Sequence, residues 1–313
     1  MGAVAKYATA PLIFLYEILD LYVMIFYIVK DGVIMKKQLY LENAIDIKEI
    51  ERSLQKTYRI DLFAKMLKAL DEYQLIQEGD KIAVGISGGK DSLLLAKMLQ
   101  QLQRFSKVRF TVEYIAMDPG FREEDRKRLE ETCKYLNIPV KIFDTNIFDV
   151  VSEIAKDSPC YLCARMRRGN LYAKARELGC NKLALGHHYN DVIETIMMNI
   201  LWTGSFRTMM PKIKSQNFEG LELIRPLYLV EEKDIIRWIN YIGVTPMDES
   251  CPIVEKKNDS QRANIKEMIQ ILKKNNPNVE KSIFKSAENI FLGAIIGYIK
   301  DGERHSFLDE YDK

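Results

Sequence analysis

The residues "SGGKDS", at positions 87–92, have the composition of a phosphate-binding loop. Gly88 and Gly89 allow the backbone to turn tightly and to approach an anion closely. Backbone amides at the start of the helix that follows would attract negative charge, and Lys90 adds a positive one. The loop therefore predicts a nucleotide site. Its expected residues are Ile86, Ser87, Gly88, Gly89, Lys90, Asp91 and Ser92.

This loop differs from a Walker A loop. The Walker pattern has a glycine, four intervening residues, then Gly-Lys and a serine or threonine. Here Val84 occupies the first position and Asp91 follows Lys90. The hydroxyl that would bind magnesium is missing, so γ-phosphate cleavage of the P-loop kind is not expected. The alternative interpretation is a plain strand-to-helix turn with Ser92 near the helix cap.

Two cysteines, Cys160 and Cys163, have C-x-x-C spacing, which lets both sulfurs point at one centre. This spacing is compatible with zinc, a redox disulfide or an iron–sulfur cluster. A structural zinc site needs four ligands, and no second C-x-x-C or suitable histidine pair follows. Cys251 is the best third ligand, whereas Cys133 and Cys180 are expected to serve as small apolar residues. Three thiolates would leave one iron of a cubane cluster open.

Basic residues follow the cysteine pair, beginning with Arg165, Arg167 and Arg168. A solvated helix face and a local phosphate-binding patch for RNA are both compatible with them. The net charge of the chain is only +2, so any surface for nucleic acid must be local.

The stretch "GHHYNDVIET" begins with Gly186, at the end of a predicted strand, where it would let a nucleotide approach the backbone. Asp191 and Glu194 have the spacing of a helix-capping pair. Asp191 is alternatively a carboxylate near the α-phosphate, either holding Mg²⁺ or serving as a base. His187 and His188 are not assigned as metal ligands.

Strands and helices alternate along the chain. Strands are expected at 81–87, 108–118, 139–145, 182–188 and 221–229, with amphipathic helices between them. In one of these helices Val192, Ile196 and Ile200 are expected to face inward. The alternation predicts an α/β fold with a doubly wound parallel sheet. Ligands bind such sheets beyond the carboxyl ends of the strands, where the loop, Met117 and Gly186 all fall.

The composition is that of an ordinary globular protein, with 313 residues of which 47% are hydrophobic and 29% charged. Residues 11–29 are apolar enough to suggest a membrane helix. However, Glu17 and Asp20 lie near its middle, and each would cost about 2.5 to 3.5 kcal/mol there. A weak anchor, a buried helix and an upstream extension before a working start at Met35 remain open.

The loop resembles the PP-loop of the ATP pyrophosphatases, which split ATP between the α- and β-phosphates. Four stretches between 77 and 262 resemble, in its order, the tRNA 2-thiocytidine synthetase family (TtcA). They are "EGDKIAVGISGGKDS", "PCYLCARMRRGNLY", "KLALGHHYNDVIET" and "IRPLYLVEEKDI". We therefore expect an apolar extension at 1–34, a helical region at 35–77, a PP-loop catalytic domain at 78–255 and a helical tail at 256–313.

The resemblance implies an ATP-dependent tRNA sulfurtransferase that uses ATP, Mg²⁺ and a [4Fe–4S] cluster. Its cluster ligands would be Cys160, Cys163 and Cys251, although better-known members have a second C-x-x-C where this chain has one cysteine. The adenine would lie near Ala116 and Met117.

The 2-oxygen of a tRNA cytidine, at position 32, would attack the α-phosphorus, and sulfide on the open iron would then displace AMP. Lys90, Arg167 and Asp191 would be catalytic. We also expect a cysteine desulfurase as sulfur donor, a cytoplasmic location and no membrane partner, and a homodimer remains open. The alternatives are a lysidine-type tRNA ligase, an amidating synthetase or a non-enzymatic nucleotide-binding regulator.

Overall fold

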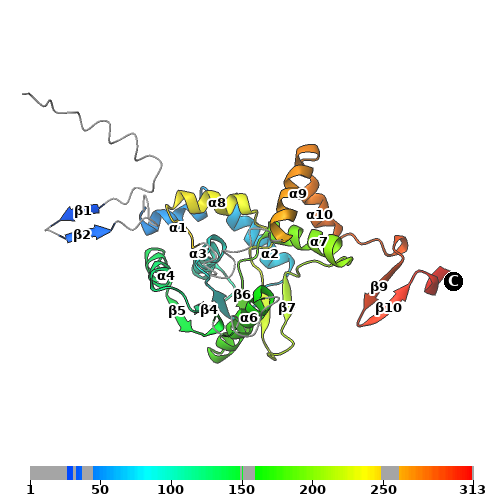
Figure 1. The fold of residues 1–313 in the computed structure, drawn as a ribbon, viewed down its shortest axis with the longest axis horizontal. Helices are drawn as coiled ribbons and strands as arrows, with labels where there is room; N and C mark the ends of the chain where they lie inside the picture. Colours follow the sequence, from blue (N-terminus) through cyan, green and yellow to red (C-terminus); the bar gives the residue numbers. More distant parts are fainter. Residues whose placement is uncertain are drawn as a thin grey trace, which may run out of the picture.

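The computed structural model describes residues 27–30, 33–36, 45–148, 150, 159–247 and 261–311, with the backbone alone for 27–30, 33–36, 159–161, 164 and 310. A six-stranded sheet with the order β5-β4-β3-β6-β8-β7 forms the centre of the fold (Figure 1). Five of its strands are parallel, and these are β3 (Lys81–Gly85), β4 (Thr111–Asp118), β5 (Val140–Asp144), β6 (Lys182–Ala184) and β8 (Glu222–Ile224). The predicted doubly wound parallel sheet is therefore confirmed.

The sixth strand, β7 (Lys212–Lys214), pairs antiparallel with β8 at the edge of the sheet. The sequence did not predict it, because three residues of alternating Lys-Ile-Lys carry almost no periodic signal. An edge strand that ends and begins with lysine is also poorly suited to pairing with another chain.

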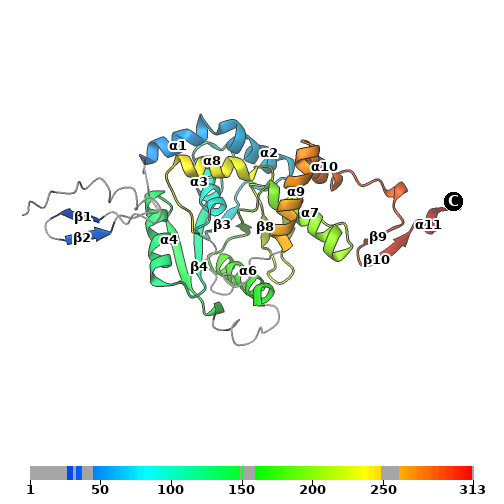
Figure 2. The same cartoon turned by 45° about the horizontal axis from the view of Figure 1, so that its top comes forward.

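Helices cover both faces of the sheet (Figures 1 and 2). They are α3 (Lys90–Phe105), α4 (Glu123–Tyr135), α6 (Pro159–Glu177) and α8 (Glu232–Tyr241). Helix α7 (Tyr189–Thr203) follows β6 and packs on other helices instead. The side chains of β3 show how both faces are covered, because successive side chains of a strand point to opposite faces of the sheet. Ile82 and Val84 pack with α3, α4 and α8, whereas Ala83 packs with α6 on the other face.

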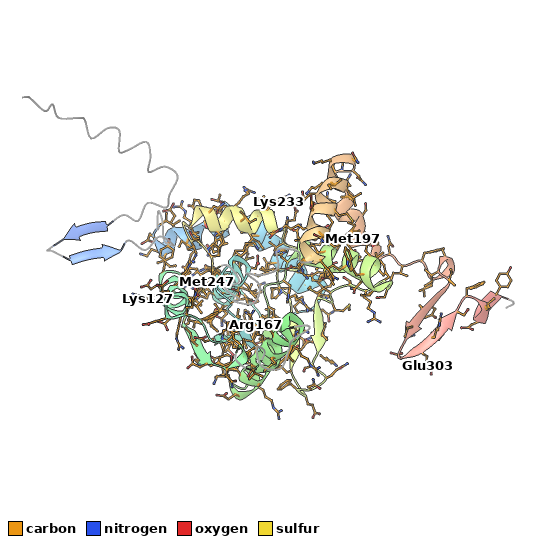
Figure 3. All side chains as sticks on the ribbon, in the orientation of Figure 1. Lys127, Arg167, Met197, Lys233, Met247 and Glu303 are labelled. Atoms are coloured by element: carbon orange, nitrogen blue, oxygen red, sulfur yellow. The ribbon has the colours of Figure 1, made fainter. Side chains whose placement is uncertain are left out.

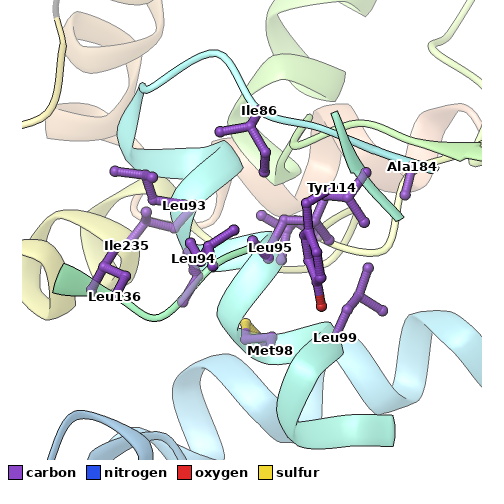
Figure 4. Packing of buried hydrophobic residues seen from close by; sticks show 14 of the residues in the cluster. Ile86, Leu93, Leu94, Leu95, Met98, Leu99, Tyr114, Leu136, Ala184 and Ile235 are labelled. Atoms are coloured by element: carbon purple, nitrogen blue, oxygen red, sulfur yellow. The ribbon is translucent and has the colours of Figure 1, made fainter. Parts of the chain in front are cut away.

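The largest hydrophobic core among the described residues surrounds helix α3. Five of its residues are fully buried there, namely Leu93, Leu94, Leu95, Met98 and Leu99. They pack with Ile86, which follows β3, and with Tyr114 of β4 (Figure 4). This core fixes the first turn of α3, and therefore the loop that precedes it, relative to the sheet.

The prediction for helix α7 was wrong at one position. Val192 and Ile196 are buried, but Ile200 is 41% exposed. Each step of four residues advances about 400° around an α-helix, so a stripe with this spacing rotates by about 40° per step. By Ile200 the stripe has turned away from the core.

Helices also precede and follow the sheet. Residues predicted as helical before the sheet form α1 (Ile47–Gln55), a π-helix (Arg59–Ala64) and α2 (Lys65–Glu72). After the sheet, α9 (Gln261–Asn275) and α10 (Val279–Ser286) pack on α7 around Ile193, Ile265 and Phe284. This second core holds the C-terminal helices beside the helix that carries Asp191.

The tail expected to be mostly helical contains α9 and α10, but it also contains strands that the sequence analysis did not predict. A hairpin of β9 (Gly297–Lys300) and β10 (Glu303–Ser306) follows a short 3₁₀ helix (Leu292–Ala294) and precedes α11 (Leu308–Tyr311). Its turn is Asp301-Gly302, and both residues have positive φ, 52° and 88°. Asp-Gly is the residue pair that favours such a turn, so the sequence carried this signal.

At the other end of the chain, β1 (Tyr27–Lys30) and β2 (Val33–Lys36) form an antiparallel hairpin. The last residues of the apolar stretch are therefore strand rather than helix, and residues 11–26 lie outside the described residues. Within the described part of the chain, no helix is both long and apolar enough to span a membrane.

Candidate functional site

The loop between β3 and α3 has the strand-to-helix geometry that the sequence predicted. Gly88 has a φ of +83°, and α3 begins at Lys90 without a side-chain cap. The Ser92 hydroxyl accepts from the Ser87 amide at 3.2 Å and donates to the Gly89 carbonyl at 2.9 Å. Ser92 thus braces the turn from inside. The uncapped helix N-terminus remains available to an anion.

Gly186, at the end of β6, lies directly against this loop. A Cβ built on Gly186 would lie 2.9 Å from the Asp91 carbonyl carbon and 3.0 Å from the Ser92 nitrogen. Real Cβ atoms do not approach backbone so closely, so only glycine fits. Gly186 allows a close backbone approach as expected, but the partner that approaches it is the loop itself.

A charged network surrounds Lys90 and Asp91. The Lys90 ammonium lies 3.1 Å from Asp91 Oδ2 and 3.2 Å from Glu232 Oε1 on α8. Burial opposes the charged form of Lys90, yet these two carboxylates hold its pKa above the ordinary value. Burial raises the pKa of Asp91, although His188 and Lys90 act in the opposite direction.

One oxygen of Asp91 has no hydrogen-bond partner among the residues that the structure describes. Asp91 Oδ1 is buried, and its neighbour His188 Nε2 lies 3.7 Å away, beyond hydrogen-bond distance. An unpaired buried carboxylate oxygen is costly, so this atom is suited to bind a cation or a donor from a ligand.

The expected capping pair of Asp191 and Glu194 was wrong. Helix α7 begins at Tyr189, and His188 is its N-cap. The His188 Nδ1 accepts from the Asp191 amide at 3.3 Å, and Asp191 Oδ2 accepts from the His188 amide at 2.9 Å. The capping box therefore lies one turn earlier than expected and fixes the Asp191 side chain against the loop.

The other oxygen of Asp191 contacts a residue that the sequence analysis missed. Arg262, in the first turn of α9, places Nη1 2.7 Å from Asp191 Oδ1 and 3.5 Å from Glu194 Oε2. Burial raises the pKa of Glu194 to about 7, and Arg262 opposes this shift only in part. No local sequence signal could have found Arg262, because the contact spans 71 residues.

The cysteine pair lies on helix α6, which spans Pro159–Glu177. Cys163 is buried with Met117, from the carboxyl end of β4, and with Ile147. Cys160 is three residues earlier in the same helix, and Cys251 lies outside the described residues. Among the described residues, no group of three potential metal ligands was found. Cys133 and Cys180 are buried as expected, and burial raises the pKa of the Cys133 thiol to about 12.

Helix α6 also carries the basic residues. Arg165 and Arg168 are exposed and Arg167 is half-buried (Figure 3). Arg225, a second residue that sequence analysis missed, is only 6% exposed at the end of β8. It is near enough to Arg168 for the charge of Arg168 to lower its pKa, after burial. The loop, Asp191, Cys163, Arg225 and Arg262 therefore all lie at the carboxyl ends of the parallel strands.

Comparison with known proteins extends this picture. The profile of the PP-loop domain family matches residues 58–267. A tRNA-cytidine(32) 2-sulfurtransferase of Citrifermentans bemidjiense is 38% identical over 226 residues, covering 71% of this chain and 88% of that protein. One from Geotalea daltonii is 39% identical over 229 residues, with 71% and 88% covered.

A solved structure is also similar. The U34-tRNA thiolase NcsA from Methanococcus maripaludis, which contains a [4Fe–4S] cluster, superposes with a TM-score of 0.60. It is 25% identical, and the match covers 81% of each chain.

Proposed function

The chain belongs to the tRNA-cytidine(32) 2-sulfurtransferase family of PP-loop proteins, and from this premise we propose that it replaces the 2-oxygen of a tRNA cytidine, at position 32, with sulfur at the expense of ATP. The observation that carries the proposal is the burial of Cys163 against Met117. The strand of Met117, β4, is next to β3, from which the PP-loop follows. A sulfur-carrying group and an activated nucleotide would therefore meet at the carboxyl ends of these two strands.

The nucleotide would bind the loop between Ile86 and Ser92, with its adenine near Ala116 and Met117. The open N-terminus of α3 and the Lys90 ammonium suit the β- and γ-phosphates. Attack by the cytidine 2-oxygen on the α-phosphorus would form an adenylated base and release pyrophosphate. Lys90 would stabilise the charge of the departing pyrophosphate.

Mg²⁺ fits this site at Asp91 rather than at Asp191. Asp91 Oδ1 is buried without a hydrogen-bond partner in the described part of the chain, and a carboxylate oxygen is a preferred magnesium ligand. Both oxygens of Asp191 already have partners, namely Arg262 and the His188 amide. Asp191 would therefore act near the α-phosphate as a base or as an orienting group.

The position of the Cys163 thiol is compatible with a [4Fe–4S] cluster. Cys163 is buried in an apolar cluster with Met117 and Ile147, and Cys160 lies one helical turn before it. Cys160, Cys163 and Cys251 would hold the cluster, which would supply the site that carries sulfur to the activated carbon. Arg167, four residues after Cys163, would contact the reacting base.

The proposal includes further partners. A cysteine desulfurase would supply the sulfur, and the free thiols of Cys133 and Cys180 suit the reducing cytoplasm. A homodimer is also proposed, because the C-terminal arm exposes Phe291, Ile296 and other apolar residues.

The test compares two buried cysteines in cells that lack the native gene. Cys163→Ala should abolish 2-thiocytidine in tRNA, measured by mass spectrometry, and should remove bound iron from anaerobically purified protein. Cys180→Ala, the matched control, should retain both. Full thiolation by Cys163→Ala would overturn the proposal, and so would the absence of 2-thiocytidine from cells with the native protein.

A further inference from the structure

Arg225 differs from every other buried charged side chain in the described part of the chain. Asp80, Lys97, Asp118, Lys182, Glu194 and Asp234 each form an ion pair within 4 Å. Arg225 is equally buried, at 6% exposed, yet among the described residues no carboxylate lies within that distance. Burying a charge without an ion-pair partner is costly, so Arg225 lowers the stability of the folded protein.

Only part of the Arg225 guanidinium is engaged. Its Nε donates to His187 Nδ1 at 3.3 Å, and its Nη1 donates to the carbonyl of Met210. Its Nη2 has no hydrogen-bond partner among the described residues. The two bonds hold the planar group in a fixed orientation and leave one side free to donate to an anion.

The groups around Arg225 are also donors. Burial and the nearby Arg225 charge lower the pKa of His187 to about 4, so its imidazole is neutral at pH 7. Because Nδ1 accepts from Arg225, the ring proton lies on Nε2, which can donate. Arg168 of α6 is close enough for its charge to depress the pKa of both His187 and Arg225, after burial. Asp191 is the opposing charge in this region, and Arg262 pairs with it.

The position of this cluster separates it from the nucleotide phosphates. Arg225 follows β8, which is separated from β3 and its loop by β6. Two strand spacings correspond to about 10 Å. Arg168 is five residues after Cys163 on α6, or about 7.5 Å along the helix axis.

We propose that Arg225, His187 and Arg168 form a phosphate site for the RNA backbone next to the cytidine that is modified. This inference rests on the proposed function and assigns the part of the site that holds the substrate. A nucleotide held there would extend along α6, with its base toward Cys163 and the PP-loop. Arg225 would anchor the phosphate, and Arg168 would close over it from the solvent side.

The experiment measures tRNA affinity over a range of salt concentrations and ATP affinity in parallel, with the full chain. Arg225→Gln should weaken tRNA binding by about 10- to 150-fold, as expected for one buried charge-assisted contact. The slope of log affinity against log salt should fall by about one. ATP affinity should not change. Because no carboxylate of the described residues pairs with Arg225, the melting temperature should stay the same or rise, whereas a structural role would lower it.

Two further variants complete the test. Arg168→Gln changes an exposed side chain and should leave the melting temperature nearly unchanged. It should weaken tRNA binding and reduce the salt slope in the same way. Arg109→Gln is the matched control, since Arg109 is exposed at the amino end of β4, and should change neither. Unchanged tRNA affinity in Arg225→Gln and Arg168→Gln would overturn the inference. Weakened ATP binding with normal tRNA binding would assign the site to the nucleotide and overturn it too. Failure of the wild-type protein to bind tRNA would instead contradict the proposed function.

Discussion

Single residues decide how closely two segments of the site can approach. Gly186→Ala would put a Cβ within 3.0 Å of the PP-loop backbone, which has no flexible side chain there to give way. We expect ATP affinity to fall at least tenfold by calorimetry, because the loop must shift. Gly169→Ala is the matched control on α6. It has open space at its Cβ and should retain ATP binding while stabilising the helix by up to about 1 kcal/mol.

At the same scale, Glu194 links stability to pH. Its folded pKa of about 7 lies above its ordinary value of 4.5, mainly through burial. The unfolded chain therefore releases this proton first, and stability falls as the pH rises from 4.5 to 7. Glu194→Gln should stabilise the protein by about 1 to 3 kcal/mol more at pH 8 than at pH 5, measured by urea denaturation. Equal effects at both pH values would contradict the raised pKa.

At the scale of the element, the N-terminus of α7 depends on a histidine. His188 caps the helix and orients Asp191 through the reciprocal bonds of the capping box. His188→Ala should cost about 0.5 to 2 kcal/mol in thermal denaturation. His188→Asn can cap the helix in the same way and should recover most of this loss. If alanine and asparagine are equally destabilising, the ring packs the core rather than caps the helix.

At the scale of the whole molecule, the C-terminal arm extends away from the body (Figure 1). It exposes large apolar side chains, which are Ile290, Phe291, Leu292, Ile296, Ile299, Phe307, Leu308 and Tyr311. Such a surface is typical of an interaction site. We expect the full chain to sediment as a dimer and a chain ending at residue 288 as a monomer. A monomeric full chain would contradict the proposed homodimer.

The sequence by itself determined the parts whose signal is local. The strand that precedes "SGGKDS" and the helix that follows it lie where the periodicity predicted them, and the glycines mark the turn between them. The spacing of Cys160 and Cys163 likewise needed no structure. Each of these features depends on backbone geometry within a few residues, which composition and period can specify.

Only the tertiary structure decided which distant side chains complete the site. Arg262 pairs with Asp191 across 71 residues, and Arg225 donates to His187 across 38. It also changed the partner of Asp191 in the capping box from Glu194 to His188. These contacts depend on how α9, β8 and α7 pack against one another, and no local pattern encodes that packing. For the same physical reason the unpaired charge of Arg225 is visible only once its burial is known.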